Sequence, residues 1–183
     1  MDTNKSQDNL VDTKGLLLKC ELAEGMTLVD CGAGNAAPFT LAGAEIVGER
    51  GTVYALDVVK SVLASIKQRV EKAGFLNVVT VWTDLEIVGA AKRVASNSAD
   101  VLVIADTLSQ SHQKEEVLKE AMRMVKTNGK ILLVDWKKSS PLGPEFKHRI
   151  SSADLKVLAE SLNLQHLETF DAGDYHWAMI LQK

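Results

Sequence analysis

The chain has 183 residues, 46% of them hydrophobic, which is enough for one well-packed core and too little for two full-sized domains. Its formal net charge of -3 gives nucleic acid no overall attraction, and the two cysteines, Cys20 and Cys31, are too few for a disulfide framework. The opening MDTNKSQDN is polar, unlike a secretion signal, and no apolar run approaches the roughly 18 to 20 residues of a membrane span.

We therefore expect a single soluble, cytoplasmic domain over residues 1–183, with a flexible segment at 1–9. Short β-branched runs alternate with amphipathic stretches, which predicts a mostly parallel sheet with helices on both faces. The predicted helices cover residues 10–20, 38–47, 59–73, 87–95 and 113–126, and we expect Asn128-Gly129 to end the last of these. The predicted strands between them cover residues 26–32, 51–58, 77–84, 99–106 and 130–136.

The pattern changes after residue 136. Residues 139–150, SSPLGPEFKHRI, carry two prolines and a glycine, which predicts a long ordered loop. A helix follows from Ser151 to Leu162, with Ser151 and Asp154 spaced as a capping box. Strands at 164–170 and 176–182 flank DAGDY, which fits a hairpin, so the last strand should run antiparallel to the others.

Three acidic residues, Asp30, Asp57 and Asp84, end three successive predicted strands beside the turn Gly32-Ala33-Gly34. The carboxyl ends of parallel strands line the ligand crevice, so one elongated ligand could touch all three. Asp57 stands where such proteins bind ribose hydroxyls, with a helix N-cap as the alternative. Asp84 either accepts from an adenine amino group or caps the helix predicted after it.

A nicotinamide or flavin dinucleotide is the main rival ligand, because Gly32, Gly34 and Ala37 satisfy G-x-G-x-x-G/A. That turn places a diphosphate at the helix N-terminus, where the carboxylate of Asp30 would repel it. S-adenosylmethionine carries a sulfonium and an ammonium next to an adenosine, so acids at the turn and at the ribose suit it better.

Five segments in this order and spacing resemble the motifs of class I S-adenosylmethionine-dependent methyltransferases: VDCGAGNAAPF, GTVYALDVV, VTVWTDLE, ADVLVIAD and KTNGKILLVDW. The resemblance implies a Rossmann-like, three-layer α-β-α sandwich with a seven-stranded sheet whose last strand is reversed. It implies that S-adenosylmethionine is held, with no metal, by Asp30, Gly32, Ala33, Gly34, Asn35, Asp57, Val58, Asp84, Leu85 and Asp106. The third glycine of the family is missing, because Asn35 and Ala36 follow Gly34.

The methyl acceptor is less defined, and two narrower resemblances compete. Lys14, Asp106, Lys137 and His176 look like the catalytic Lys-Asp-Lys-His set of fibrillarin, which implies methylation of a ribose 2′-hydroxyl in RNA. KTNGKILLVDW and the closing hairpin are similar to small-molecule methyltransferases of the quinone-biosynthesis type. In the alternatives without a catalytic role, Lys14 is a solvated helix residue and His176 is a hydrogen-bonded core histidine.

A third hypothesis is a non-catalytic S-adenosylmethionine-binding subunit that needs a partner; otherwise the protein acts as a monomer. About 25 residues precede the first predicted strand, which leaves little material for a lid and favours a large or partner-presented acceptor. We also expect the proline loop, residues 139–150, to border the acceptor pocket, because it leaves its strand on the ligand side. The basic residues around it form either a phosphate-binding rim or ordinary solvated charges: Lys137, Lys138, Lys147, His148 and Arg149.

Overall fold

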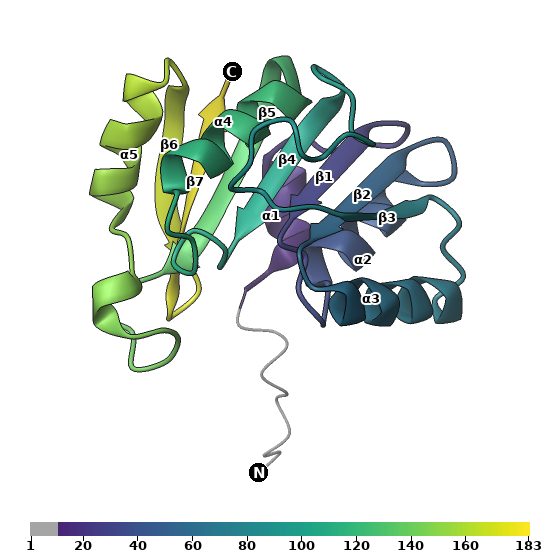
Figure 1. Cartoon of the computed structure of the whole chain (residues 1–183), viewed down its shortest axis with the longest axis horizontal. Helices are drawn as coiled ribbons and strands as arrows, with labels where there is room; N and C mark the ends of the chain where they lie inside the picture. The colour runs from purple at the N-terminus through teal and green to yellow at the C-terminus, as the bar shows by residue number, and fades with distance from the viewer. Residues whose placement is uncertain (1–10) are drawn as a thin grey trace.

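One seven-stranded sheet in the order β3-β2-β1-β4-β5-β7-β6 forms the centre of the computed structural model, which describes residues 11–183 (Figure 1). The strands are β1 Thr27–Cys31, β2 Thr52–Asp57, β3 Val78–Trp82, β4 Ala99–Ala105, β5 Val125–Trp136, β6 Gln165–Ala172 and β7 His176–Gln182. The pairs among β1 to β5 are parallel, whereas β7 runs antiparallel to both β5 and β6. The predicted sheet with its reversed last strand is confirmed. The prediction for residues 1–9 lies outside the described residues.

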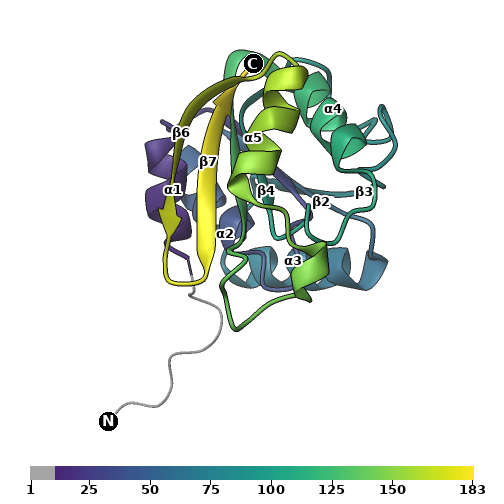
Figure 2. The same cartoon turned by 90° about the vertical axis from the view of Figure 1, so that its left-hand side faces the viewer.

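Helices cover both faces of the sheet and give three layers, as predicted. α1 (Thr13–Lys19), α2 (Pro38–Val47) and α3 (Lys60–Lys72) cover one face, and α4 (Lys114–Met124) and α5 (Ser152–Ser161) cover the other. Figure 2 shows α1 and α5 on opposite sides of the β6–β7 hairpin. Side chains that alternate along each strand feed the two cores, so Leu132 packs toward α1 and α2 while Leu133 packs toward α4 and α5. No helix of residues 11–183 is long and apolar enough to span a membrane.

The helix predicted for residues 87–95 is absent, because turns replace it. Gly89 has φ +84°, a left-handed conformation that interrupts a helix. The N–H groups of Gly89 and Ala91 donate to the Glu120 carboxylate on α4, at 2.7 and 3.2 Å, instead of to helical carbonyls. The amphipathic pattern at this position therefore reflects packing of an irregular connection against α4.

The predicted end of α4 at Asn128-Gly129 is wrong. The helix ends at Met124, Val125 is already extended, and Asn128 and Gly129 lie within β5. The register jumps there from Ala99 opposite Val125 to Val101 opposite Lys130, and Asn128 has φ +64°. The left-handed residue thus shapes an irregularity in the strand rather than the end of a helix.

In the last third of the chain, the structure agrees closely with the prediction from the sequence. The backbone N–H of Asp154 donates to the Ser151 hydroxyl at 3.1 Å, so Ser151 is the N-cap of α5. Residues 139–150 form a loop with a single 3₁₀ turn, Phe146–His148. The loop follows the carboxyl end of β5, and this places it at the ligand edge of the sheet.

Candidate functional site

Two adjoining cavities open at the carboxyl edge of the parallel strands, one of about 520 Å³ and one of about 290 Å³. Gly32, Gly34 and Gln110 line both of them. The larger cavity extends toward the ends of β2 and β3, and the smaller one lies between α2, the end of β4 and the start of β7. The position matches the crevice where open α/β sheets bind ligands.

The turn after β1 needs its glycines. Gly32 and Gly34 have φ +75° and +65°, which residues with a Cβ rarely adopt. A Cβ on Gly32 would overlap the Thr107 side chain, whose hydroxyl donates to the Cys31 and Ala105 carbonyls at 3.1 and 3.0 Å. A Cβ on Gly34 would meet no atom nearer than 4.0 Å, so it would occupy open space beside the cavities. The backbone of the turn is therefore open to a ligand.

Asp57 connects this turn to the end of β2. Its two carboxylate oxygens accept from the N–H groups of Gly34 at 3.2 Å and of Val59 at 2.9 Å. Val59, not Asp57, is the N-cap residue of α3, so the helix-cap alternative does not describe Asp57. Each oxygen keeps a free lone pair, which leaves the carboxylate able to accept from a diol in the larger cavity.

The end of β3 supplies the opposite wall of the larger cavity. Asp84 accepts from the Glu86 N–H at 2.9 Å and lines the cavity with Val58 and Leu85. The Thr83 hydroxyl also lies there, buried and without a hydrogen-bond partner. A buried hydroxyl without a partner costs free energy, and a ligand polar group would satisfy it.

Asp30 is more enclosed than predicted. It is 2% exposed, and its carboxylate accepts from the Thr40 hydroxyl on α2 at 2.6 Å. Burial raises the pKa of Asp30 to about 6, an effect that the bond to Thr40 partly offsets. Asp30 nevertheless lines the smaller cavity with Ala33 and Asn35, so it offers negative charge to a cation at neutral pH.

Asp106 and His176 meet in the smaller cavity, although they are far apart in the chain. Nε2 of His176 lies 3.2 Å from Oδ1 of Asp106, but the two groups are not aligned as a hydrogen bond. Both ring nitrogens of His176 and Oδ1 of Asp106 are buried without hydrogen-bond partners. Asp106 also has φ +52°, a strained conformation for a residue other than glycine, and its N–H donates to the Val134 carbonyl. Strain and unpaired buried polar atoms at one point favour a functional site.

The two predicted lysines lie elsewhere. Lys14 contacts Glu45 of α2 at 2.6 Å, with both side chains about half exposed at 51% and 60%. Lys137 contacts Asp171 at 3.0 Å and the Gly173 carbonyl at 3.0 Å, on the β6–β7 hairpin. Neither lysine lines either cavity, and neither does any residue of the proline loop. Only Asp106 and His176 of the predicted four-residue set come together.

Sequence reasoning missed Asp135 and the polar residues after β4. Asp135 is buried and accepts from the N–H groups of Ser109 at 3.0 Å and Trp136 at 2.8 Å. Burial raises the pKa of Asp135 to about 6, and the nearby Asp106 carboxylate adds to the shift. Gln110 donates to the Asp106 carbonyl at 2.6 Å. The only signals in the sequence were the place of Asp135 near the end of a predicted strand and that of Ser109 and Gln110 soon after another.

The comparisons with known proteins agree with this geometry. A family model described as a methyltransferase domain matches residues 22–173. Demethylmenaquinone methyltransferase of Shouchella clausii is 30% identical over 136 residues, which are 73% of this chain and 54% of that protein. An arsenite methyltransferase of Aquipseudomonas alcaligenes is 30% identical over 118 residues, 62% of this chain and 34% of that protein. The chain therefore spans about half the length of the first relative and less of the second.

A solved structure covers more of the chain. The crystal structure of a SAM-dependent methyltransferase from Aquifex aeolicus superposes with a TM-score of 0.85 at 25% identity. The superposition covers 94% of this chain and 89% of that one, so the whole layer arrangement is shared.

Proposed function

The chain belongs to the methyltransferase-domain family, and we propose that it transfers a methyl group from S-adenosylmethionine to a small organic acceptor. The observation that carries the proposal is the pair of the buried His176 and the partly exposed Asp106, beside the Gly32–Gly34 turn. Both ring nitrogens of His176 and Oδ1 of Asp106 are buried without hydrogen-bond partners. A cavity of about 290 Å³ at this pair has room for a compact acceptor group.

The cofactor is S-adenosylmethionine, and the residues around the larger cavity fit it. Asp57 and Asp84 offer acceptors for an adenosine, and the unpartnered Thr83 hydroxyl lies beside them. Asp30 offers charge to the cationic end of the cofactor. When bound, the cofactor supplies an electrophilic methyl group on a positively charged sulfur.

The chemistry assigned to this chain is proton removal and exclusion of water. His176, 1% exposed, would accept the proton of an acceptor hydroxyl as the acceptor's bond to the methyl carbon forms and the carbon–sulfur bond breaks, with S-adenosylhomocysteine as the leaving group. The Asp106 carboxylate 3.2 Å away then stabilises the imidazolium that results. Apolar side chains around the pair, Phe39 and Val134 among them, keep solvent away.

RNA ribose methylation is not supported. The relatives that the comparisons name act on a quinone precursor and on arsenite. Lys14 and Lys137 are engaged with Glu45 and Asp171 instead of with Asp106, so they give no phosphate contact at the cavity. Arg149, part of the basic cluster, is buried and bonds to backbone carbonyls. A small acceptor needs none of these cations.

Arsenite is a poor candidate for the acceptor. It is soft and binds thiolates, but both cysteines are free and buried, and neither lines the two cavities. Burial raises the pKa of Cys20 to about 12, and Cys20 lines a separate cavity with Met26 and Lys130 at the amino-terminal edge of the sheet. Burial likewise raises the pKa of Cys31. We therefore favour a hydroxylated ring compound of the quinone-precursor type.

The test is transfer of tritiated methyl from S-adenosylmethionine into cell extract, fractionated into small metabolites, protein and RNA. We expect label in the small organic fraction. His176→Gln should lower that transfer by about 10²-fold or more while the dissociation constant of S-adenosylhomocysteine stays near that of the unmodified protein. Asp106→Asn should lower transfer by a similar factor. His166→Gln, the same change on edge strand β6, is the matched control.

Two other outcomes would redirect the proposal. Label in RNA would restore the ribose hypothesis. Tight binding of S-adenosylhomocysteine without transfer into any fraction would favour a non-catalytic subunit that needs a partner.

A further inference from the structure

Arg149 organises the proline loop, residues 139–150, from within. Arg149 is only 9% exposed. Its guanidinium donates to five backbone carbonyls, of Lys137 at 3.0, Lys138 at 3.3, Ser140 at 2.6, Leu142 at 2.8 and Pro144 at 2.8 Å. No carboxylate of residues 11–183 forms an ion pair with it. All three nitrogens of this planar group therefore serve to fix the path of residues 137–144.

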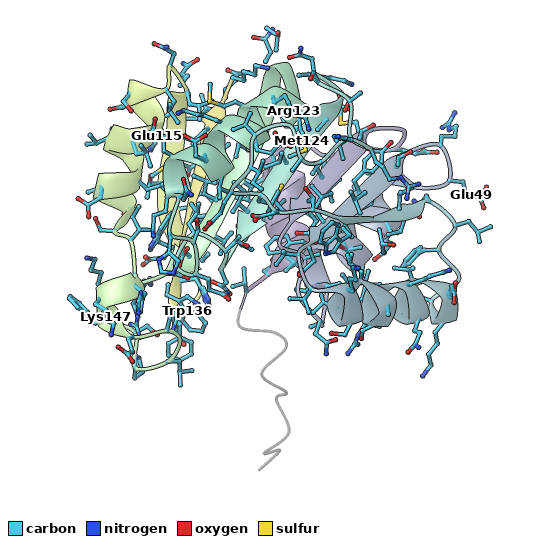
Figure 3. All side chains as sticks on the ribbon, in the orientation of Figure 1. Glu49, Glu115, Arg123, Met124, Trp136 and Lys147 are labelled. Carbon is cyan, nitrogen blue, oxygen red and sulfur yellow. The ribbon has the colours of Figure 1, made fainter. Side chains whose placement is uncertain are left out.

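The loop that Arg149 fixes presses on Trp136 at the end of β5. Gly143 has φ +93°, and a Cβ built on it would overlap the Trp136 indole, so the glycine backbone lies directly against the ring. Figure 3 labels Trp136 and the loop residue Lys147, both toward the lower left of the view. The Trp136 ring also packs on the His176 imidazole, with centroids 4.1 Å apart and planes at 45°.

No hydrogen bond sets the rotation of the His176 imidazole. The strand register, with Trp136 opposite His176, fixes the backbone but not the ring torsion. That terminal torsion is broad by nature, and neither ring nitrogen has a hydrogen-bond partner to narrow it. The contact with Trp136 therefore constrains the direction in which His176 presents its nitrogens.

We propose that Gly143 and Arg149 are positioning residues for methyl transfer: they hold Trp136 against His176 and so aim the imidazole at Asp106 and the acceptor. This inference rests on the proposed function of His176. It extends the site to a loop that lines neither cavity. Misplacement of a reacting group by about 1 Å costs on the order of 10²-fold in rate, so the loop has a measurable part in the chemistry.

Proton NMR gives a readout that does not depend on activity. A tryptophan ring packed on His176 shifts the imidazole Cε1–H signal upfield, and loss of that signal in His176→Gln assigns it. Gly143→Ala should displace the Trp136 ring from its present contact with His176, because the added Cβ would overlap the indole, and so should abolish most of the upfield shift. Arg149→Met should have the same effect. Trp136→Phe keeps a flat ring and should retain part of the shift, whereas Trp136→Leu should remove it.

Kinetics on the same variants supply the second arm. Gly143→Ala, Arg149→Met and Trp136→Leu should lower kcat by about tenfold to 10²-fold, with Trp136→Phe partly restored and the dissociation constant of S-adenosylhomocysteine unchanged. Gly25→Ala is the matched control, because Gly25 has φ +81° but no atom within 4 Å of the added Cβ.

The outcomes separate this proposal from the one beneath it. Loss of the upfield shift with an unchanged kcat, or loss of kcat with an unchanged shift, would overturn the positioning role. Full transfer by His176→Gln would instead overturn the proposed function, and the NMR arm would still report whether the loop holds the Trp136–His176 contact.

Discussion

At the scale of single residues, the acidic side chains of the site have a structural role and also offer acceptor groups to a ligand. Asp57 ties the glycine turn to the start of α3 through Gly34 and Val59, and its free lone pairs face the larger cavity. Asp106 adopts a strained backbone conformation, and its carboxylate lies beside His176. Backbone strain and unpaired polar atoms lower the free energy of unfolding of the ligand-free protein. Binding of a ligand to these groups offsets that loss of stability.

Asp57→Ala should weaken binding of S-adenosylhomocysteine by roughly 1.5 to 3 kcal/mol, because hydrogen bonds to a charged group are lost. Calorimetric titration measures this, and Glu49→Ala, an exposed acid beside Gly74 at the other edge, is the control. Unfolding curves of both variants check that the turn is intact. An unchanged dissociation constant would leave Asp57 with only its backbone role.

The buried Asp30 predicts a pH dependence of stability. Burial raises its pKa from 3.8 to about 6, so the native state binds more protons than the unfolded state between about pH 4 and 6. The contribution of Asp30 to the free energy of unfolding is complete below about pH 4 and is lost as the pH rises through 6. Asp30→Asn should flatten this fall, which has a slope of up to about 1.4 kcal/mol per pH unit.

Urea denaturation of the unmodified protein and of Asp30→Asn, at intervals from pH 4 to 7, gives the difference directly. Parallel curves for the two proteins would show that Asp30 does not titrate in this range.

The positions of Asp57, Asp106 and His176 in the fold were predictable because each stands at a strand end, and strand ends follow from the hydrophobic pattern. The sequence could not place Lys14, whose long side chain reaches Glu45, 31 residues away. Nor could it find Gly143 against Trp136, because that contact depends on the path of a loop. Contacts set by backbone register were predictable, and contacts set by flexible side chains or loops were not.

At the scale of elements, the connection from β3 to β4 depends on α4. Glu120, 0% exposed, accepts from the N–H groups of Gly89 and Ala91 and pairs with Arg123 at 2.8 Å. Burial opposes ionisation of Glu120, but these bonds outweigh it and its pKa is lowered. Figure 3 labels Arg123 on α4. This anchoring explains why the period of an amphipathic helix at residues 87–95 does not produce one.

Glu120→Gln should destabilise the protein by about 3 kcal/mol, since it removes one partner of a buried ion pair. Amide hydrogen exchange at Gly89 and Ala91 should become faster at the same time. Lys119→Ala, on the exposed face of α4, breaks contacts with Glu115 and Glu116 and should cost far less, because solvent screens these ion pairs. Equal losses of stability in Glu120→Gln and Lys119→Ala would mean that the buried Glu120–Arg123 pair stabilises the protein no more than the exposed pairs do.

At the scale of the whole molecule, ligand binding should stabilise every layer, because the cavities join β1, β2, β3 and β4. S-adenosylhomocysteine at 100 times its dissociation constant should add about 2.7 kcal/mol, or roughly 5 to 10 °C in Tm. NAD at the same concentration should add nothing, because Asp30 stands next to the position of its diphosphate. Thermal unfolding with each compound decides this, and an equal shift with NAD would contradict the cofactor assignment.

The insertion of β7 between β5 and β6 sets an order on biosynthesis. During translation, β6 leaves the ribosome before its neighbour exists, and β5 keeps an open backbone edge until residues 176–182 emerge. Open strand edges are templates for aggregation. The nascent chain is therefore prone to aggregation during this interval and is a substrate for chaperones. The strand that ends this interval also carries His176 to Asp106, and a chain still being made therefore has neither a sealed sheet nor the pair at its centre.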